Sequence, residues 1–321
     1  MSERSIDTRL VYGFLDAGKT TYVLDCIRND FFYKYGSTLI LCFELGETEY
    51  DAEMLRERNA AASYYDGEED VGTFCLRSIE AHRPDRIYVE MNTMMENLRE
   101  RFPACMHVTS IVTWIDWETL KLYYVNFKQM IARMVAESQQ VTFRGCPSRE
   151  LLKPYSQAFR LMNHKASYLR QDPMGYHEKA FDLFLPFSLE QKQIEIPEAY
   201  FLPFWLDAHD HPEHYADKTI RFTDPLELRC STDGSRAAGR VVMTCCMADL
   251  QFMAFELEGE IEDAAGGWIT IDASARIASD MYGQKHLKLH PESLRRAAPP
   301  TALILDSSRT DSESKRNGMS Q

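Results

Sequence analysis

The segment Gly13-Phe14-Leu15-Asp16-Ala17-Gly18-Lys19-Thr20 constrains the fold most strongly, because it has the pattern G-x-x-x-x-G-K-T directly after a short apolar run. This pattern is typical of a strand that ends in a glycine-rich loop and continues into a helix near Lys19. Such a loop directs backbone N–H groups at phosphate oxygens, and the positive end of the helix adds to the attraction. The pattern therefore predicts an α/β fold with a phosphate-binding loop; an ordinary glycine-rich turn is the alternative.

Each position in this loop has a chemical role. Gly13 and Gly18 permit tight turns, Lys19 reaches the β- and γ-phosphates, and the Thr20 hydroxyl ligates Mg²⁺. Lys19 is also a predicted catalytic residue, because its charge stabilises a phosphoryl group in transfer. The predicted nucleotide-binding residues are Gly13, Asp16, Ala17, Gly18, Lys19, Thr20 and Thr21.

Short apolar runs alternate with helical patterns along the first part of the chain, which predicts βαβ units and a mostly parallel sheet. Strands are expected at 10–14, 38–43, 86–90, 110–116 and 140–143, with an edge strand at 181–187. Apolar residues at helical spacing from Leu120 to Val135 predict a helix packed on the sheet. A second helical stretch is expected over 148–169.

The pattern changes after about residue 190 to short alternating runs at 218–222, 240–246, 252–257 and 268–271, separated by turn residues. Such runs are typical of a small β-rich domain, either a barrel or a sandwich. We therefore predict a nucleotide-binding domain over 1–190, a His- and Asp-rich connector over 191–217, a β-rich domain over 218–300 and a disordered tail over 301–321.

Composition excludes several classes of partner. The chain has 36 basic and 49 acidic residues and a net charge of −13. This negative charge disfavours general electrostatic binding to nucleic acid or to an anionic membrane. No signal-peptide core is visible, and no apolar run approaches the roughly 20 residues that a membrane helix needs. We expect a cytoplasmic protein that binds no nucleic acid and does not insert into a membrane, with its eight cysteines as thiols.

Acidic residues follow two of the predicted strands. A phosphate-binding loop needs a carboxylate at the end of a neighbouring strand to hold Mg²⁺, and Glu90 ends the run Ile87-Tyr88-Val89. Glu90 is therefore a predicted magnesium ligand and catalytic residue. Glu44 and Asp51 are further candidates from the acidic loop after the second strand, for which a solvated surface loop is an equal alternative.

These motifs together resemble those of the CobW-type GTPases, which are related to the nucleotide-dependent helpers of nickel and cobalamin enzymes. The first loop is similar, and Phe43-Glu44-Leu45-Gly46 with Asp51 resembles the family pattern N-E-F-G-x-x-x-x-D. The family's E-x-x-G aligns with Glu90-Met91-Asn92-Thr93. The resemblance covers about the first 190 residues and implies GTP and Mg²⁺ binding, slow hydrolysis, and metal delivery to a client protein.

The chain also departs from the family pattern. Asp16 and Thr93 stand where the family has glycine, and the paired-cysteine motif C-x-C-C is missing, with only Cys75 in that region. The guanine-reading motif N-K-x-D is replaced by Thr142-Phe143-Arg144-Gly145-Cys146, which has no aspartate. GTP is thus favoured by resemblance alone, and ATP stays open. Arg144 could neutralise phosphate charge, although a surface ion pair is the favoured interpretation.

Two downstream segments carry residues that suit a transition metal such as zinc. Cys245, Cys246 and Asp249 lie in a segment that resembles the T-C-C-x-x-D domain of permease-associated bacterial proteins, and two buried thiols are the alternative. His209, His211 and His214 lie within six positions near Pro212, where a polar turn is the alternative.

The sequence as a whole predicts a Mg²⁺-dependent GTPase of CobW type that couples its nucleotide state to the handling of zinc, cobalt or nickel. Its expected partners are a nucleoside triphosphate and a client protein, and a homo-oligomer is an open alternative. A nucleotide-binding regulatory or adaptor protein with little hydrolysis is the alternative function, because Asp16, Thr93 and the missing base-reading motif each weaken the enzyme pattern.

Overall fold

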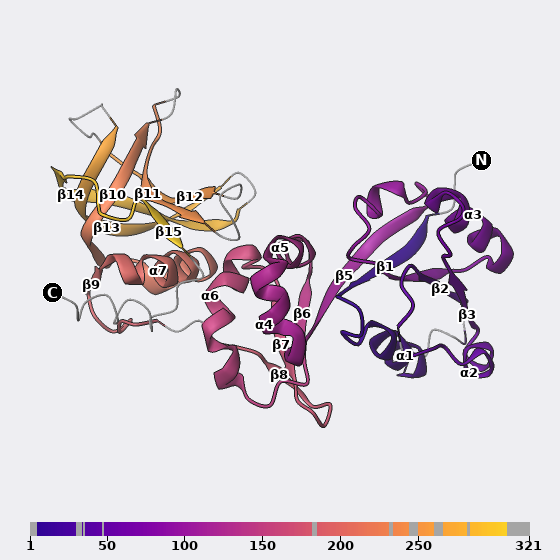
Figure 1. Cartoon of the computed structure of the whole chain (residues 1–321). Coiled ribbons are helices and arrows are strands. Elements are labelled where there is room, and N and C mark those ends of the chain that lie inside the picture. The colour runs from indigo at the N-terminus through magenta and orange to yellow at the C-terminus, as the bar shows by residue number, and fades with distance from the viewer. Residues whose placement is uncertain are drawn as a thin grey trace. The chain divides into compact units, whose positions relative to one another are not determined.

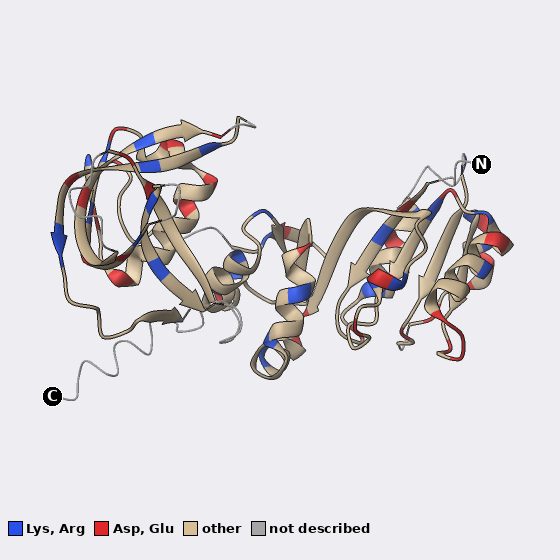
Figure 2. Ribbon diagram, turned by 90° about the horizontal axis from the view of Figure 1, so that it is seen from above, with Lys and Arg blue, Asp and Glu red and all other residues tan. Residues whose placement is uncertain are grey.

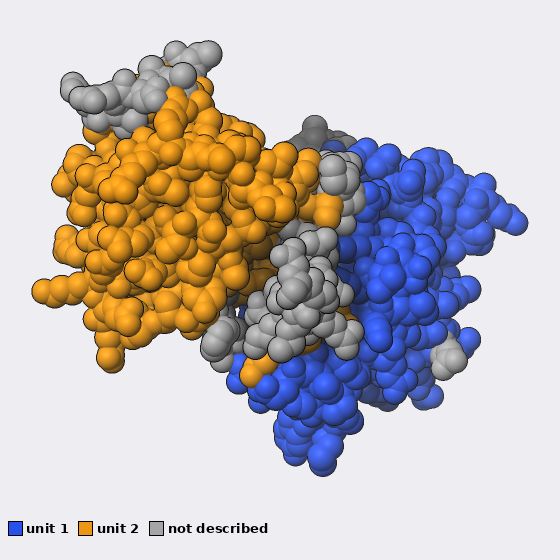
Figure 3. Space-filling view, turned by 60° about the vertical axis from the view of Figure 1, so that its left-hand side comes forward, with its two compact units in different colours: residues 1–152, 165–181 blue, residues 153–164, 182–321 orange. Residues whose placement is uncertain are grey.

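The computed structural model describes residues 5–29, 34, 36–46, 48–181, 185–230, 234–243, 250–259, 266–280 and 283–306. Contacts divide the chain into two compact units, coloured separately in Figure 3. The first unit comprises residues 1–152 and 165–181, and the second comprises 153–164 and 182–321. Each unit has its own sheet and its own core.

The first unit is built on an eight-stranded sheet with the order β3-β2-β4-β1-β5-β6-β7-β8. Neighbouring strands are parallel except at the edge, where β8 runs antiparallel to β7. The strands are β1 (Ile6–Tyr12), β2 (Thr38–Cys42), β3 (Ala60–Tyr64), β4 (Arg86–Glu90), β5 (Met106–Asp116), β6 (Gln140–Arg144), β7 (Ser167–Gln171) and β8 (His177–Lys179). This is the mostly parallel α/β sheet that the sequence predicts.

Helices cover both faces of this sheet (Figure 1). Alternating side chains of the strands pack against the helices on opposite faces. In β2, Leu39 and Leu41 join the cluster with α3 (Val71–His82), whereas Ile40 and Cys42 join the cluster with α1 (Lys19–Asn29) and α2 (Ala52–Glu57). Because β2 is buried on both faces, its sequence Leu39-Ile40-Leu41-Cys42 is a continuous apolar run.

The helical predictions for residues 120–169 need two corrections, of which the second concerns a helix of the second unit. The expected single helix between Leu120 and Val135 is two helices, α4 (Trp117–Asn126) and α5 (Lys128–Ala136), because Phe127 between them has non-helical backbone. The helix expected over 148–169 is a 3-10 turn (Arg149–Leu152) followed by α6 (Lys153–Met162), and its last residues belong to β7. The edge strand is β8, while residues 182–184 of the expected strand 181–187 lie outside the described residues.

The second unit contains a closed five-stranded barrel. Its strands follow one another in the order β11-β12-β14-β13-β10, and β10 pairs with β11 to close the ring. They are β10 (Thr219–Cys230), β11 (Arg236–Met243), β12 (Leu250–Leu257), β13 (Gly267–Ser279) and β14 (Lys285–Arg296). Two short strands, β9 (Gln193–Ile196) and β15 (Ile304–Asp306), extend the sheet beside β10 and β11. The predicted β-rich domain is thus a barrel.

The segment expected as a connector, 191–217, is part of this core. It contains β9, the helix α7 (Glu198–Asp210) and a 3-10 turn (Pro212–Tyr215). Phe201, Phe204 and Leu206 of α7 are buried in the cluster that the barrel strands form. A helix with so many buried apolar residues is an element of the core rather than a linker.

Lys and Arg residues in the described part of the chain are spread over helices and strands of both units (Figure 2). Within the described ranges, no helix has both the length and the apolarity needed to cross a bilayer. The described cysteines, Cys26, Cys42, Cys75, Cys105, Cys146 and Cys230, are all free thiols.

Candidate functional site

The glycine-rich loop lies between the end of β1 and the start of α1, at the carboxyl edge of the first sheet. Gly13 and Gly18 have φ values of +153° and +100°. A Cβ atom on Gly13 would lie 2.6 Å from the Trp114 carbonyl oxygen of β5, so no side chain fits there. The loop borders a cavity of about 120 Å³, lined by Leu15, Asp16, Gly18, Lys19, Thr20, Thr21, Glu44, Gly46, Thr48, Glu90 and Arg144.

The Lys19 ammonium group is nearly buried and uses its donors on three oxygens. It donates to the carbonyl oxygens of Gly13 and Phe14 at 2.9 and 3.0 Å, and to Glu44 Oε2 at 2.5 Å. The side chains of Lys19 and Glu44 are only 5% and 14% exposed. Because an ammonium group has three donors, an incoming phosphate must replace one of these partners, and Glu44 is the only side chain among them. The predicted magnesium ligand Glu44 is therefore the ion-pair partner of Lys19 in this structure.

Glu90, at the end of β4, is 3% exposed and accepts two hydroxyl hydrogen bonds. Thr20 Oγ1 donates to Glu90 Oε2 at 3.1 Å, and the Tyr50 hydroxyl donates to Oε1. Burial raises the pKa of the Glu90 carboxyl, while the hydrogen bonds and Lys19 act in the opposite direction. The donor set of a carboxylate and a threonine hydroxyl suits a hard cation such as Mg²⁺, which prefers oxygen ligands. Thr20 and Glu90, both predicted from the sequence, thus lie together.

The raised pKa of Glu90 has a consequence for stability. As pH rises from about 4.5 through the raised pKa, the unfolded chain ionises freely, whereas ionisation in the fold is opposed by burial. The free energy of unfolding therefore falls over this range in the absence of nucleotide and Mg²⁺. We expect Glu90→Gln to remove this fall and to be more stable than the wild type above the raised pKa, by about 1.4 kcal/mol per unit of elevation.

Urea unfolding of both proteins from pH 4 to pH 8 measures the effect. Glu80→Gln is the matched control, because Glu80 is exposed on α3. If the free energy of unfolding falls equally with pH in the wild type and in Glu90→Gln, burial of Glu90 does not cause the pH dependence of stability.

Asp16, where the resembled family has glycine, has a φ of +59°. The position is thus left-handed, a conformation that glycine adopts freely and aspartate tolerates. A Cβ atom on Gly46 would lie 2.9 Å from Asp16 Oδ1, so the loop after β2 lies close to the glycine-rich loop. The Asp16 carboxylate also borders the cavity, where it would repel a phosphate.

We expect Asp16→Asn and Asp16→Gly to tighten nucleotide binding by up to about fivefold, since exposed charge interactions contribute about 1 kcal/mol or less. The free energy of unfolding should change by about 1 kcal/mol or less, because both replacements accept a positive φ. Titration with a fluorescent nucleotide at low and high salt measures the effect. Tightening in Asp16→Gly but not in Asp16→Asn would assign the effect to backbone conformation rather than to charge.

Arg144 ends β6 and covers one side of the glycine-rich loop. Its Nη1 atom donates to the Asp16 carbonyl oxygen at 3.2 Å and lies 3.9 Å from Asp116 Oδ2, at the end of β5. A Cβ atom on Gly18 would lie 2.7 Å from Arg144 Cδ. The favoured interpretation as an ion pair agrees with this geometry, and the side chain also borders the cavity.

The structure does not bring Asp51 to this group. Its carboxylate caps α2 by accepting from the backbone N–H groups of Glu53 and Met54, which have no partner in the first turn of a helix. Thr93 lies closer, because its hydroxyl donates to the Gly13 carbonyl oxygen at 2.9 Å. Ala17 is buried in the loop, and Thr21 lines the cavity.

The two downstream metal predictions have different outcomes. Cys245, Cys246 and Asp249, with the T-C-C-x-x-D resemblance, lie outside the described residues. His211 and His214 do come together, with Glu213 as a third member. His209 does not join them, because its ring stacks on Trp205 with centroids 3.9 Å apart, and its Nδ1 lies 3.2 Å from the Trp205 carbonyl oxygen.

Tyr50 and Asp116, which contact the cavity residues Glu90 and Arg144, were not predicted from the sequence. Tyr50 lies in the acidic segment and is 9% exposed. The sequence signal for its burial was an aromatic residue between two charged ones, Glu49 and Asp51. Asp116 ends a strand as Glu90 does, and it caps α4 through the N–H groups of Glu118 and Thr119.

No family model matches the chain. No curated protein matches it either. Among solved structures, the chain is similar to the hydrogenase maturation factor HypB from Archaeoglobus fulgidus, with 13% identity and a TM-score of 0.37, over 52% of this chain and 81% of that chain.

Two structures of the Zn(II)-bound YjiA GTPase are also similar, each over 83% of this chain and 89% of that chain. The triple mutant has 14% identity and a TM-score of 0.37, and the E. coli protein has 12% identity and a TM-score of 0.35. At this level of similarity, any functional assignment of the site depends on the residues of this chain.

Proposed function

We propose that the chain binds a nucleoside triphosphate with Mg²⁺ at the loop 13–20 and hydrolyses it slowly. One observation carries this proposal: the nearly buried Lys19 ammonium and the nearly buried Glu90 carboxylate both border the cavity beside the glycine-rich loop. A cation for phosphate and a carboxylate for Mg²⁺ at the same cavity are the two charges that phosphoryl transfer requires.

Each residue has a distinct part in this proposal. Thr20 and Glu90 would hold Mg²⁺, which when bound neutralises charge on the β- and γ-phosphates. Lys19 leaves Glu44 and contacts the phosphates, so nucleotide binding is coupled to release of the loop after β2. Arg144 lines the same cavity beside Gly18, so its guanidinium group can contact a phosphate bound there.

We further propose GTP as the nucleotide and transition-metal handling as the purpose of the cycle. Support for GTP comes from the resemblance of residues 43–51 and 90–93 to CobW-type GTPases. Support for metal handling comes from the imidazole and carboxylate groups that gather after α7. A client protein would then receive the metal when hydrolysis restores the Lys19–Glu44 pair.

A nucleotide-binding adaptor with little hydrolysis is the second candidate. The Lys19–Glu44 ion pair favours it, because Lys19 must break a short, poorly solvated contact before it can act on phosphate. Phosphate release from GTP and from ATP, each with and without Mg²⁺, separates the two. Multiple turnovers that require Mg²⁺ are expected; tight binding without turnover would replace the hydrolase by the adaptor.

A further inference from the structure

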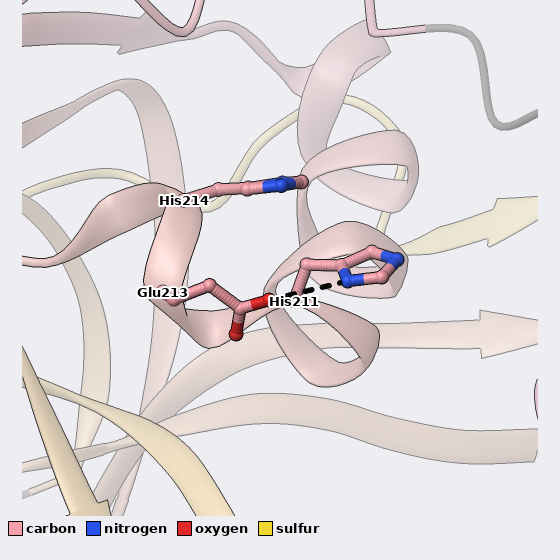
Figure 4. A group of neighbouring side chains, drawn as sticks. All are labelled: His211, Glu213 and His214. Atoms are coloured by element: carbon pink, nitrogen blue, oxygen red, sulfur yellow. Dashed lines mark hydrogen bonds and ion pairs between the residues drawn. The ribbon is translucent and has the colours of Figure 1, made fainter.

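The turn that follows α7 gathers three metal-binding side chains. His211, Glu213 and His214 each offer one ligand atom, and these atoms all lie within 4.8 Å of one another. His211 Nδ1 and Glu213 Oε1 are 3.4 Å apart, and Figure 4 shows the carboxylate pointing toward the ring. Two ligands of a tetrahedral zinc ion, each at about 2.0–2.1 Å from the metal, lie roughly 3.3 Å apart. This pair already has the spacing that one metal ion requires.

Buried side chains and a backbone hydrogen bond hold the backbone of this turn in place. Pro212 and Tyr215 are buried, and the Tyr215 ring packs edge-on against Phe204 with centroids 4.9 Å apart. The backbone N–H of His211 donates to the Asp207 carbonyl oxygen at 2.6 Å. The three side chains therefore project from a rigid support, and the exposed side chains of His211 and Glu213 can adjust toward a common ion.

Asp207 provides a second, independent indication. Its carboxylate is 4% exposed and accepts from His214 Nδ1 at 2.9 Å and from the Tyr215 hydroxyl at 2.8 Å. Among the described residues, these are the side-chain partners of this carboxylate, and neither is a permanent cation. A buried carboxylate is costly without a positive charge nearby. A metal ion on the opposite nitrogen of His214 would supply that charge.

The same hydrogen bond determines how His214 can bind. Because the carboxylate is an acceptor, the proton of the neutral ring lies on Nδ1, and Nε2 is left as a ligand. A carboxylate behind a metal-bound histidine is a common arrangement, which fixes the ring and raises its basicity. Asp207 is thus a positioning residue for His214.

We propose that His211, Glu213 and His214 form a site for a divalent transition metal of the zinc, cobalt and nickel class. Two imidazole nitrogens and one carboxylate oxygen suit these ions better than Mg²⁺ or Ca²⁺, which prefer oxygen ligands alone. Three protein ligands leave a fourth position open, and the His211 and Glu213 side chains are 53% and 59% exposed. Such a site exchanges its metal readily. The identity of this metal as cargo rests on the proposed function, whereas its binding does not.

Cobalt(II) titration of the full-length chain, followed by visible absorption, tests the site. Accessible thiols are first alkylated so that no exposed cysteine can act as a ligand. We expect one equivalent of Co²⁺ with bands from nitrogen and oxygen ligands, which Zn²⁺ displaces. His211→Ala and His214→Ala should each weaken binding at least as strongly as Asp207→Asn, for which we expect about 10- to 100-fold.

The controls are His209→Ala, from the same segment, and His107→Ala, an exposed histidine at the start of β5. Both should bind Co²⁺ as the wild type does, and circular dichroism confirms that each variant is folded. Absence of Co²⁺ binding in the wild type, or unchanged binding in the His211→Ala/His214→Ala double variant, would overturn the proposal.

The nucleotide site is measured in the same variants with a fluorescent GTP analogue. Unchanged nucleotide binding in the double variant, together with lost Co²⁺ binding, supports the metal site. If the wild type binds nucleotide but no Co²⁺, the metal site alone is overturned. If it binds Co²⁺ but no nucleotide, the proposed function alone is overturned.

Discussion

Lys19→Ala is expected to weaken nucleotide binding strongly and, at saturating nucleotide, to lower phosphate release by about 10²- to 10³-fold, the usual effect of removing one preorganised donor from a charged transition state. Lys19 is 5% exposed and borders the cavity beside the glycine-rich loop. No other described lysine lines this cavity, so no ammonium group nearby can replace it. Phosphate release under saturating nucleotide and Mg²⁺, together with titration of a fluorescent nucleotide, measures the two effects.

Lys121→Ala is the matched control, because Lys121 lies exposed on α4. Its activity should equal that of the wild type. Equal nucleotide affinity in Lys19→Ala and in the wild type would show that the phosphates bind elsewhere.

Glu44→Gln is expected to tighten nucleotide binding by about tenfold. In this structure, Glu44 Oε2 lies 2.5 Å from the Lys19 ammonium nitrogen, and a phosphate would have to displace this carboxylate. Replacing the carboxylate by an amide exchanges an ion pair for a hydrogen bond from the ammonium group to an uncharged acceptor, which is weaker by about 1 kcal/mol or more. The tightening should occur both with and without Mg²⁺, because it arises from the lysine rather than from the metal.

Glu49→Gln is the control for the charge of the same loop, because Glu49 is exposed and does not line the cavity. The experiment also decides between two roles of Glu44. Weaker binding in Glu44→Gln only when Mg²⁺ is present would identify Glu44 as a magnesium ligand, as the sequence predicted, and not as a competitor of phosphate.

Features set by local sequence were predictable. The glycine-rich loop, the strands β2, β4 and β6, and the position of Glu90 at the end of β4 each follow from a few consecutive residues. Parallel strands place their carboxyl ends on one edge of the sheet, which is why Thr20 and Glu90 were expected together. Asp16 was identified as unusual from the sequence, and its φ of +59° explains why glycine suits that position.

Features that depend on distant partners were not predictable. Glu44 pairs with Lys19, 25 positions earlier in the chain, whereas Asp51, in the same acidic loop, caps α2. Both carboxylates look alike in sequence, and only the path of the loop separates them. The Tyr50 hydroxyl donates to Glu90, which lies 40 positions later in the chain, and no local sequence pattern predicts such a contact.

The second unit shows the same limit. Strands β10 to β13 were located approximately, but β14 was missed, and closure of the barrel depends on pairing of β10 with β11. Spacing alone grouped His209 with His211 and His214. The helix α7 ends at Asp210, so His209 turns onto Trp205 while Glu213 joins the two histidines of the turn.

Calorimetric titration of GTP into the nucleotide-free wild-type chain, with and without Mg²⁺, decides whether the chain is a nucleotide-binding protein. We expect one GTP bound per chain, with tighter binding when Mg²⁺ is present. Absence of binding for both GTP and ATP in the presence of Mg²⁺ would contradict the proposed function.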